Sequence, residues 1–246
     1  MIRYGHNSEQ LTIPFADLPP LNTALLGRQK CKEKGQPIED ILANKDATLL
    51  FMRMAVTHTS KNEMPIVHPY TGNIPDNIMG FYRVASSGPY SIVPHFYFDD
   101  KRMHHYWNHP FRTAEVLSHF PCSIGLDLSM TNDMLRPQKM YASYLNKLWV
   151  AWLQSRGHEV IPNVSFPDEW EEDYWLEGWP IHSVIAINSV GVLSHGNPKE
   201  WLKAVERIRT ELKPTYILRY GALLPGENTE NCTYFANDNN RAAYGR

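Results

Sequence analysis

The sequence predicts an α/β protein whose βα units form a parallel sheet, arranged as an incomplete or distorted (β/α) barrel. Three observations carry this prediction. Short apolar runs recur after Gly80, segments with helical period lie between several of them, and the runs gain polar residues towards their carboxyl ends. Strands that alternate with helices favour parallel pairing through right-handed crossovers.

The composition narrows the class of protein. The 246 residues are 43% hydrophobic, which is enough for one large core. Lys and Arg number 24 against 26 Asp and Glu, so no general positive field favours duplex nucleic acid. The N-terminus lacks an apolar leader, no run approaches the roughly 18 apolar residues of a membrane span, and the cysteines are few and scattered. We therefore expect a cytoplasmic protein without membrane contact.

Residues 1–79 are expected to form an N-terminal arm with one helix and an irregular loop. The first part is rich in Pro, Asn and polar residues. Pro37 fits the first position of a helix that ends near Ala55. Turn-forming residues dominate 57–79, which is typical of a long connection or a loop that carries function.

The α/β core is predicted to span residues 80–224. Its strands are the apolar runs that begin near Phe81, Ser91, Ser123, Glu159, Ser183 and Thr215. One helix of the core ends at Gly157 and carries its apolar stripe on Met140, Tyr144, Leu148 and Trp152.

A second helix begins with Asn197 as its N-cap and Pro198 at its first position. Its inward side is marked by Trp201, Val205, Ile208 and Leu212. The Asn-rich residues 225–246 are expected to form a polar, flexible C-terminal tail.

Polar residues gather at the carboxyl ends of the predicted strands. Because side chains alternate faces along a strand, His95, Tyr97 and Asp99 share one face of their run. Other runs end in Asp127 and Ser129, Asn163 and Ser165, Asn188 and Ser189, and Arg219 to Gly221. Parallel α/β folds bind ligands over this edge, so we expect a polar pocket there. The alternative for each residue is that it caps the next helix.

Asp99 and Asp127, together with His95, are the predicted catalytic groups. If their strands are neighbours, the two carboxylates converge. Their pKa values would then separate into an acid and a base, or both would hold a divalent cation. The alternative is that Asp99 or Asp100 caps the following segment. The predicted ligand-binding residues are Asn163, Asn188, Tyr220 and Ser129.

Other motifs are weaker. His105 and His109 are four residues apart, but a third ligand and an intervening Glu are missing, so we predict no metal site. No cofactor is identified either. The helix opened by Asn197 would offer N–H groups to an anion. The acidic aromatic loop after the third strong strand would stack on a neutral ring or a protein, or cover the core, through Trp170, Trp175 and Trp179.

The blocks HFYFDD, LDLSMTNDMLRPQKMYASYLNKLWVAWLQSRGHEVIPNVSF, AINSVG and PTYILRYG occur in a characteristic order and spacing. Together they resemble an uncharacterised domain-of-unknown-function family of bacteria and their phages, numbered 4417, over roughly residues 80–222. The resemblance implies a phage or mobile-element setting and brings no established activity. Leu128 stands where the family is expected to have an aromatic residue after the acid, which is a packing change.

These observations favour a hydrolase or transferase that acts on a small polar ligand by carboxylate acid/base chemistry. The ligand would be a nucleotide, a nucleoside or a sugar. The alternative is a non-catalytic binding protein that sequesters a host ligand or blocks a host protein. Both functions need a polar pocket, so the sequence does not separate them.

Overall fold

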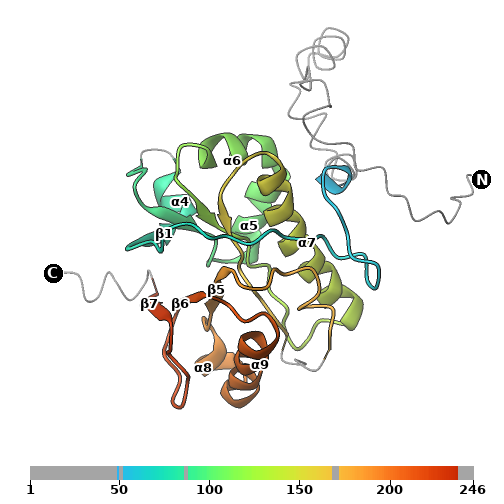
Figure 1. Ribbon diagram of the computed structural model, residues 1–246, viewed down its shortest axis with the longest axis vertical. Coiled ribbons are helices and arrows are strands. Elements are labelled where there is room, and N and C mark those ends of the chain that lie inside the picture. The colour runs from blue at the N-terminus through green and yellow to red at the C-terminus, as the bar shows by residue number, and fades with distance from the viewer. Residues whose placement is uncertain (1–48, 50–51, 86–87, 168–171, 238–246) are drawn as a thin grey trace, which may run out of the picture. The chain divides into compact units, whose positions relative to one another are not determined.

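The chain divides into two compact units, Met1–Phe51 and Met52–Arg246, and the fold described below belongs to the second. Figure 1 shows the computed structural model. It describes residues 49, 52–85, 88–167 and 172–237. Most of the predicted arm and the end of the predicted tail lie outside these residues.

The structure combines helices with parallel strands in small sheets, in keeping with the predicted α/β class. In the described residues the strands form three small sheets in which every neighbouring pair is parallel. The first sheet pairs β1 with β2, the second pairs β3 with β4, and the third has the order β5-β6-β7. Their bounds are Ile78–Gly80, Val93–His95, Ser123–Ile124, Val160–Ile161, Val184–Asn188, Tyr216–Tyr220 and Cys232–Phe235. The described strands do not close into a barrel.

The second and third sheets are joined just beyond β4. Asn163 forms a parallel bridge to Ala186 of β5. The N–H of Val164 donates to the carbonyl of Ala186 at 2.9 Å, and the N–H of Ala186 donates to the carbonyl of Pro162 at 2.8 Å. This bridge brings the carboxyl ends of β4 and β5 to the same edge.

Two differences from the predicted strands have simple causes. The run at Phe81 was predicted as a strand, but residues Phe81–Val84 form a short helix, α4, because β1 ends one residue earlier. Phe81 and Val84 are buried, so an apolar run without a clear period was ambiguous between strand and helix. β7 lies within the predicted tail. This half-exposed edge strand pairs with β6 through backbone groups, which its polar sequence does not reveal.

Helices lie between most of the strands along the chain. In chain order, α5 and α6 come between β2 and β3, α7 comes between β3 and β4, and α8 and α9 come between β5 and β6. Figure 1 labels these five helices. Both strongly predicted helices are confirmed. α7 ends shortly before Gly157, which has a positive φ of 83°. The bounds are Asp100–Asn108, Pro110–Leu117, Arg136–Ser155, Val192–His195 and Pro198–Glu211.

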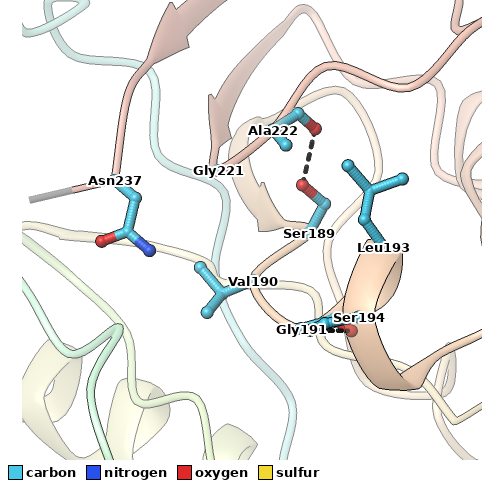
Figure 2. A pocket seen from close by; sticks show the side chains of 8 residues that line it. All are labelled: Ser189, Val190, Gly191, Leu193, Ser194, Gly221, Ala222 and Asn237. Atoms are coloured by element: carbon cyan, nitrogen blue, oxygen red, sulfur yellow. Dashed lines mark hydrogen bonds between the residues drawn. The ribbon is translucent and has the colours of Figure 1, made fainter. Parts of the chain in front are cut away.

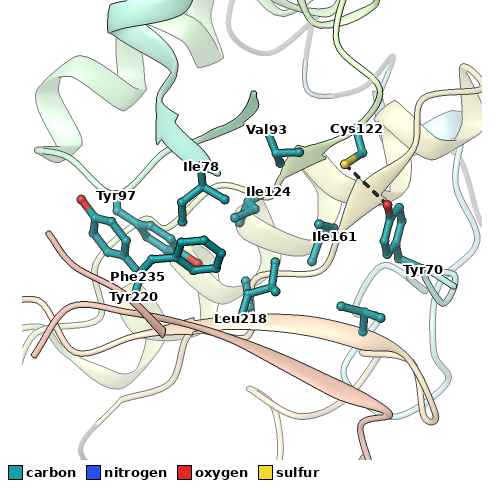
Figure 3. Packing of buried hydrophobic residues seen from close by; sticks show 12 residues of the cluster. Tyr70, Ile78, Val93, Tyr97, Cys122, Ile124, Ile161, Leu218, Tyr220 and Phe235 are labelled. Carbon is teal, nitrogen blue, oxygen red and sulfur yellow. Dashed lines mark hydrogen bonds between the residues drawn. The ribbon is translucent and has the colours of Figure 1, made fainter. Parts of the chain in front are cut away.

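One hydrophobic cluster receives side chains from all the described strands (Figure 3). Its members from the strands are Ile78, Val93, Ile124, Ile161, Val184, Ala186, Leu218, Tyr220 and Phe235. Tyr70, from the predicted irregular loop, joins the same cluster, and its carbonyl accepts the N–H of Val184 at 3.0 Å. The part of the predicted irregular loop around Tyr70 therefore packs into the core.

No helix in the described part of the chain is both long enough and apolar enough to cross a lipid bilayer.

Candidate functional site

Asp127 is the centre of a polar cluster at the carboxyl ends of β3, β4 and β5. The side-chain amide of Asn163 donates to Oδ1 of Asp127 at 2.9 Å. The side-chain amide of Asn188, the last residue of β5, donates to Oδ2. Each of the three residues lies at or beyond the carboxyl end of a different strand. They meet because parallel strands direct their carboxyl ends to one edge.

The Asn163 amide is itself held in place. It is fully buried, its Oδ1 accepts the hydroxyl of Tyr97 at 2.8 Å, and its Nδ2 also donates to the carbonyl of Leu126 at 3.0 Å. Burial, reinforced by the charge of Asp127, raises the pKa of Tyr97 well above its usual value. The phenol is therefore a hydrogen-bond donor at neutral pH.

Aromatic rings form the base of the cluster. The rings of Tyr97 and Tyr220 stack with centroids 4.6 Å apart. The ring of His95 lies 4.7 Å from that of Tyr220, and its Nδ1 accepts the N–H of Tyr97 at 3.1 Å. His95 and Tyr220 are buried, so they support Tyr97 from the interior side.

Asp100 and Ser129 lie at the outer side of the cluster. The Ser129 hydroxyl donates to Oδ1 of Asp100 at 3.0 Å, and the Ser129 N–H approaches Oδ2 at 3.3 Å. Ser129 is exposed and Asp100 is half-buried. The charge of Asp100 acts on the Asp127 carboxyl.

The protonation of Asp127 is set by opposing effects. Burial raises its pKa to about 6, and the charge of Asp100 acts in the same direction. Hydrogen bonds from Asn163, Ser165 and Asn188 lower the pKa and limit the shift. The carboxyl therefore titrates close to neutral pH, which is the range in which a side chain exchanges protons efficiently with a ligand.

Asp99, predicted as the partner of Asp127, has another place in the structure. It is the N-cap of α5, and its carboxylate accepts the N–H of Arg102 at 3.0 Å. The Arg102 guanidinium lies 3.8 Å from the other oxygen. The neighbouring Asp100 is the carboxylate that acts on Asp127, so the structure brings together Asp100 and Asp127.

Replacing Asp99 with Ala is expected to lower the free energy of unfolding by about 1 kcal/mol, because the first turn of α5 loses its side-chain acceptor. Urea unfolding followed by circular dichroism measures this change. Asp99→Ser, which retains an acceptor, is the matched control and should stay within a few tenths of a kcal/mol of the parent. An equal loss in both variants would contradict the capping role.

Asn146 was not selected from the sequence, and it links the cluster to Ser165, a polar residue of the predicted strand ends. Asn146 of α7 is buried, its Oδ1 accepts the N–H of Leu128 at 2.8 Å, and its Nδ2 donates to Oγ of Ser165 at 3.0 Å. Ser165 in turn bonds to Asp127. The one sequence signal for Asn146 is an amide amid the apolar residues of a buried helix.

The remaining sequence motifs lie away from the Asp127 cluster or have a role in the fold. The rings of His105 and His109 have centroids 5.2 Å apart on the exposed side of α5. Trp175 and Trp179 are buried, which agrees with the alternative of a cover over the core, and Trp170 lies outside the described residues. Asn197 caps α9, and its side chain accepts hydrogen bonds from the N–H groups of residues 199 and 200. These are the groups that an anion at this helix end would bind. Across the described ranges, no group of three His, Cys, Asp or Glu residues is arranged to hold a metal ion.

A pocket of about 220 Å³ adjoins the cluster (Figure 2). Its walls are formed by the segment that follows β5, including part of α8, and by the residues that follow β6 and β7. The lining begins one residue after Asn188. The lining residues are Ser189, Val190, Gly191, Leu193, Ser194, Gly221, Ala222 and Asn237.

The fold and the cluster define a parallel α/β protein with a candidate site at the carboxyl edge of its strands. Residues 57–237 match the family model described as Domain of unknown function (DUF4417), and the chain belongs to this family. The resemblance seen in the sequence is thereby confirmed. The match begins before Gly80, in agreement with the packing of Tyr70 into the core.

Two curated relatives are bacteriophage proteins. The chain is 26% identical to the Gene 1 protein of Mycobacterium phage D29 over 183 residues, which cover 71% of this chain and 66% of the relative. It is 25% identical to the Gene 1 protein of Mycobacterium phage L5 over 183 residues, which cover 71% of this chain and 78% of the relative. No solved structure matches the chain.

Proposed function

We propose that this protein is an enzyme, a hydrolase or transferase, that acts on a small polar ligand at the carboxyl edge of its strands with Asp127 as the acid/base group. The observation that carries the proposal is the placement of Asp127. Two amides from two other strand ends hold its oxygens, and burial raises its pKa to about 6. A carboxyl group in such surroundings is typical of general acid/base catalysis.

The proposed roles follow from the contacts. Asn163 and Asn188 orient the carboxylate, and Tyr97 is a positioning residue because it holds Asn163. Asp127 would take a proton from a ligand hydroxyl or water and return it to the leaving group. Ser129, bonded to Asp100 at the outer side, would contact the ligand.

We also propose that the three sheets are arcs of an incomplete or distorted (β/α) barrel. The single core cluster supports this arrangement, because each described strand directs a side chain into it. The interior of a (β/α) barrel is filled in this way, and its sites lie at the carboxyl ends of the strands. The polar cluster around Asp127 has the position that this architecture gives to a site.

Asp127→Asn is expected to lower turnover by about 10²–10⁴-fold, because the amide cannot exchange a proton with the ligand. The assay follows product formation from a panel of nucleosides, nucleotides and sugar esters. If Asp127 is the base, the parent protein loses activity as the pH falls through about 6, where the carboxylate becomes protonated.

Asp133→Asn, in the exposed loop nearby, is the matched control and should retain activity. Circular dichroism establishes that both variants are folded. Full turnover by folded Asp127→Asn would rule out the acid/base role.

A non-catalytic binding protein is the second candidate, and one observation favours it. Both oxygens of Asp127 already accept hydrogen bonds from protein amides, as in a cluster built to hold a ligand. In that case the panel would show binding without product formation, and Asp127→Asn would weaken binding. A ligand or protein of a phage host would be the natural target, given the phage relatives.

A further inference from the structure

We propose that the pocket beyond β5, β6 and β7 holds an uncharged heteroaromatic ring, so that the ligand of this protein is a nucleobase or a nucleoside. The inference rests on the proposed function, because it names the ligand class of the same strand edge. It depends on the lining of the pocket, its backbone hydrogen bonds, its size and its connection to Asp127.

The lining is uncharged, and it combines apolar side chains with the small polar side chains of Ser189, Ser194 and Asn237. None of the eight residues that line the pocket has a charged side chain. Val190 and Leu193 are 47% and 58% exposed, and Leu223, next to the lining residue Ala222, is 52% exposed. Exposed apolar side chains beside a concave surface are typical of a site that packs against a ring.

The backbone of the pocket offers little to a phosphate. The N–H of Val190 donates to Oδ1 of Asn188 at 2.9 Å. The N–H groups of Val192 and Ser194 donate to carbonyls of this same loop, each at 3.1 Å. A phosphate site needs free N–H groups or cationic side chains, and these donors are already used.

The opposite wall is fixed as well. The Ser189 hydroxyl donates to the carbonyl of Ala222 at 2.7 Å, as Figure 2 shows, and the N–H of Gly221 donates to the carbonyl of Phe235 at 3.0 Å. Gly221 has a φ of 99°, and a Cβ there would lie 2.9 Å from the Ser189 hydroxyl. Gly221 therefore allows the segment after β6 to pack closely against Ser189 on this side of the pocket.

The size of the pocket fits one ring. Its volume of about 220 Å³ is below the roughly 300–1,000 Å³ of sites that enclose a drug-sized molecule. A ring in the pocket would leave its substituent outside. Asn188 connects the two places, because its Oδ1 accepts the N–H of Val190 and its Nδ2 donates to Asp127. The substituent, a ribose in a nucleoside, would thus lie towards Asp127.

Ligand-observed NMR saturation transfer tests the inference with adenine, adenosine, uracil, uridine, ribose 5-phosphate and inorganic phosphate as probes. We expect saturation of the ring protons of the bases or nucleosides, and none of ribose 5-phosphate. Leu193→Asp places a charge in the pocket and should weaken ring binding by about tenfold or more. Leu135→Asp makes the same change at a leucine that is 70% exposed before α7, and should leave binding unaltered.

The outcomes separate this inference from the proposed function. Comparison of adenine with adenosine, and of uracil with uridine, tells a free base from a nucleoside. Equal ring binding by Leu193→Asp and the parent, or no ring binding by the parent, would overturn the inference. A preference for ribose 5-phosphate or inorganic phosphate would also overturn it, while the acid/base role of Asp127 would still be decided by Asp127→Asn and its pH dependence.

Discussion

Replacing Glu227 with Gln is expected to lower the free energy of unfolding by about 3 kcal/mol or more, because it leaves the charge of Arg219 buried without its carboxylate. The Arg219 side chain is fully buried and that of Glu227 is 2% exposed. The Glu227 carboxylate accepts from both Nε and Nη2 of the guanidinium. The guanidinium also lies 4.4 Å from the centroid of the Trp201 ring, so little water can replace the lost partner.

The same change should affect the pocket. Nη2 of Arg219 donates to the carbonyl of Ala222 at 2.8 Å, and Oε2 of Glu227 accepts the N–H of Leu224 at 3.1 Å. The pair therefore fixes the loop after β6. Chemical denaturation measures the stability, and the exposed Glu206→Gln on α9 is the matched control, with an expected change below about 0.5 kcal/mol. Indistinguishable stabilities of the two variants would show that the pair contributes nothing to folding.

Lys147→Met is expected to raise the free energy of unfolding at pH 7 by about 1–4 kcal/mol, as when buried ionic groups are replaced by apolar ones. Lys147 of α7 is fully buried. Its Nζ donates to Oγ of Ser143 at 2.5 Å, approaches the carbonyl of Tyr174 at 3.4 Å, and lies 5.0 Å from the ring centroid of Trp179. Burial lowers its pKa to about 7, although the charge of Glu177 opposes this shift.

The sign of the pH dependence follows from the two pKa values. The unfolded chain binds a proton on this lysine up to about pH 10.5, whereas the folded protein releases it above about pH 7. Between these values the unfolded state binds more protons, so the stability of the parent rises with pH, by at most about 1.4 kcal/mol per pH unit. The difference in free energy of unfolding between Lys147→Met and the parent should therefore become smaller from pH 7 to pH 10.

Denaturation at several pH values measures this difference. Lys203→Met is the matched control, because Lys203 is exposed on α9 and should give a pH-independent difference. If the difference between Lys147→Met and the parent were the same at pH 7 and pH 10, the lysine would be charged in the folded protein over the whole range.

The sequence predicted the centre of the candidate site better than its edges. Strand alternation placed His95 and Tyr97 on one face, and both rings pack against Tyr220. The same rule fails for Asp99 because β2 ends at His95. Beyond that point the backbone turns into α5, and Asp99 becomes its cap.

The missed residues depend on contacts between distant segments. Asn146 and Lys147 are polar residues in a helix, and such residues are usually exposed. The partners that make their burial tolerable are the backbone of Leu128, Ser165 and the carbonyl of Tyr174. Lys147 also donates to Ser143, which lies on the same helix. The other hydrogen-bond partners of these two side chains come from distant segments, so they leave no local pattern in the sequence.

The hydrogen bonds around Asp127 have a single direction. The Tyr97 hydroxyl donates to Oδ1 of Asn163, and the Val190 N–H donates to Oδ1 of Asn188. Each amide is thereby held with its N–H groups towards the carboxylate and its acceptor turned away. A proton that reaches Asp127 finds no acceptor in either amide. Its exchange is therefore left to the Ser165 hydroxyl, the ligand and solvent.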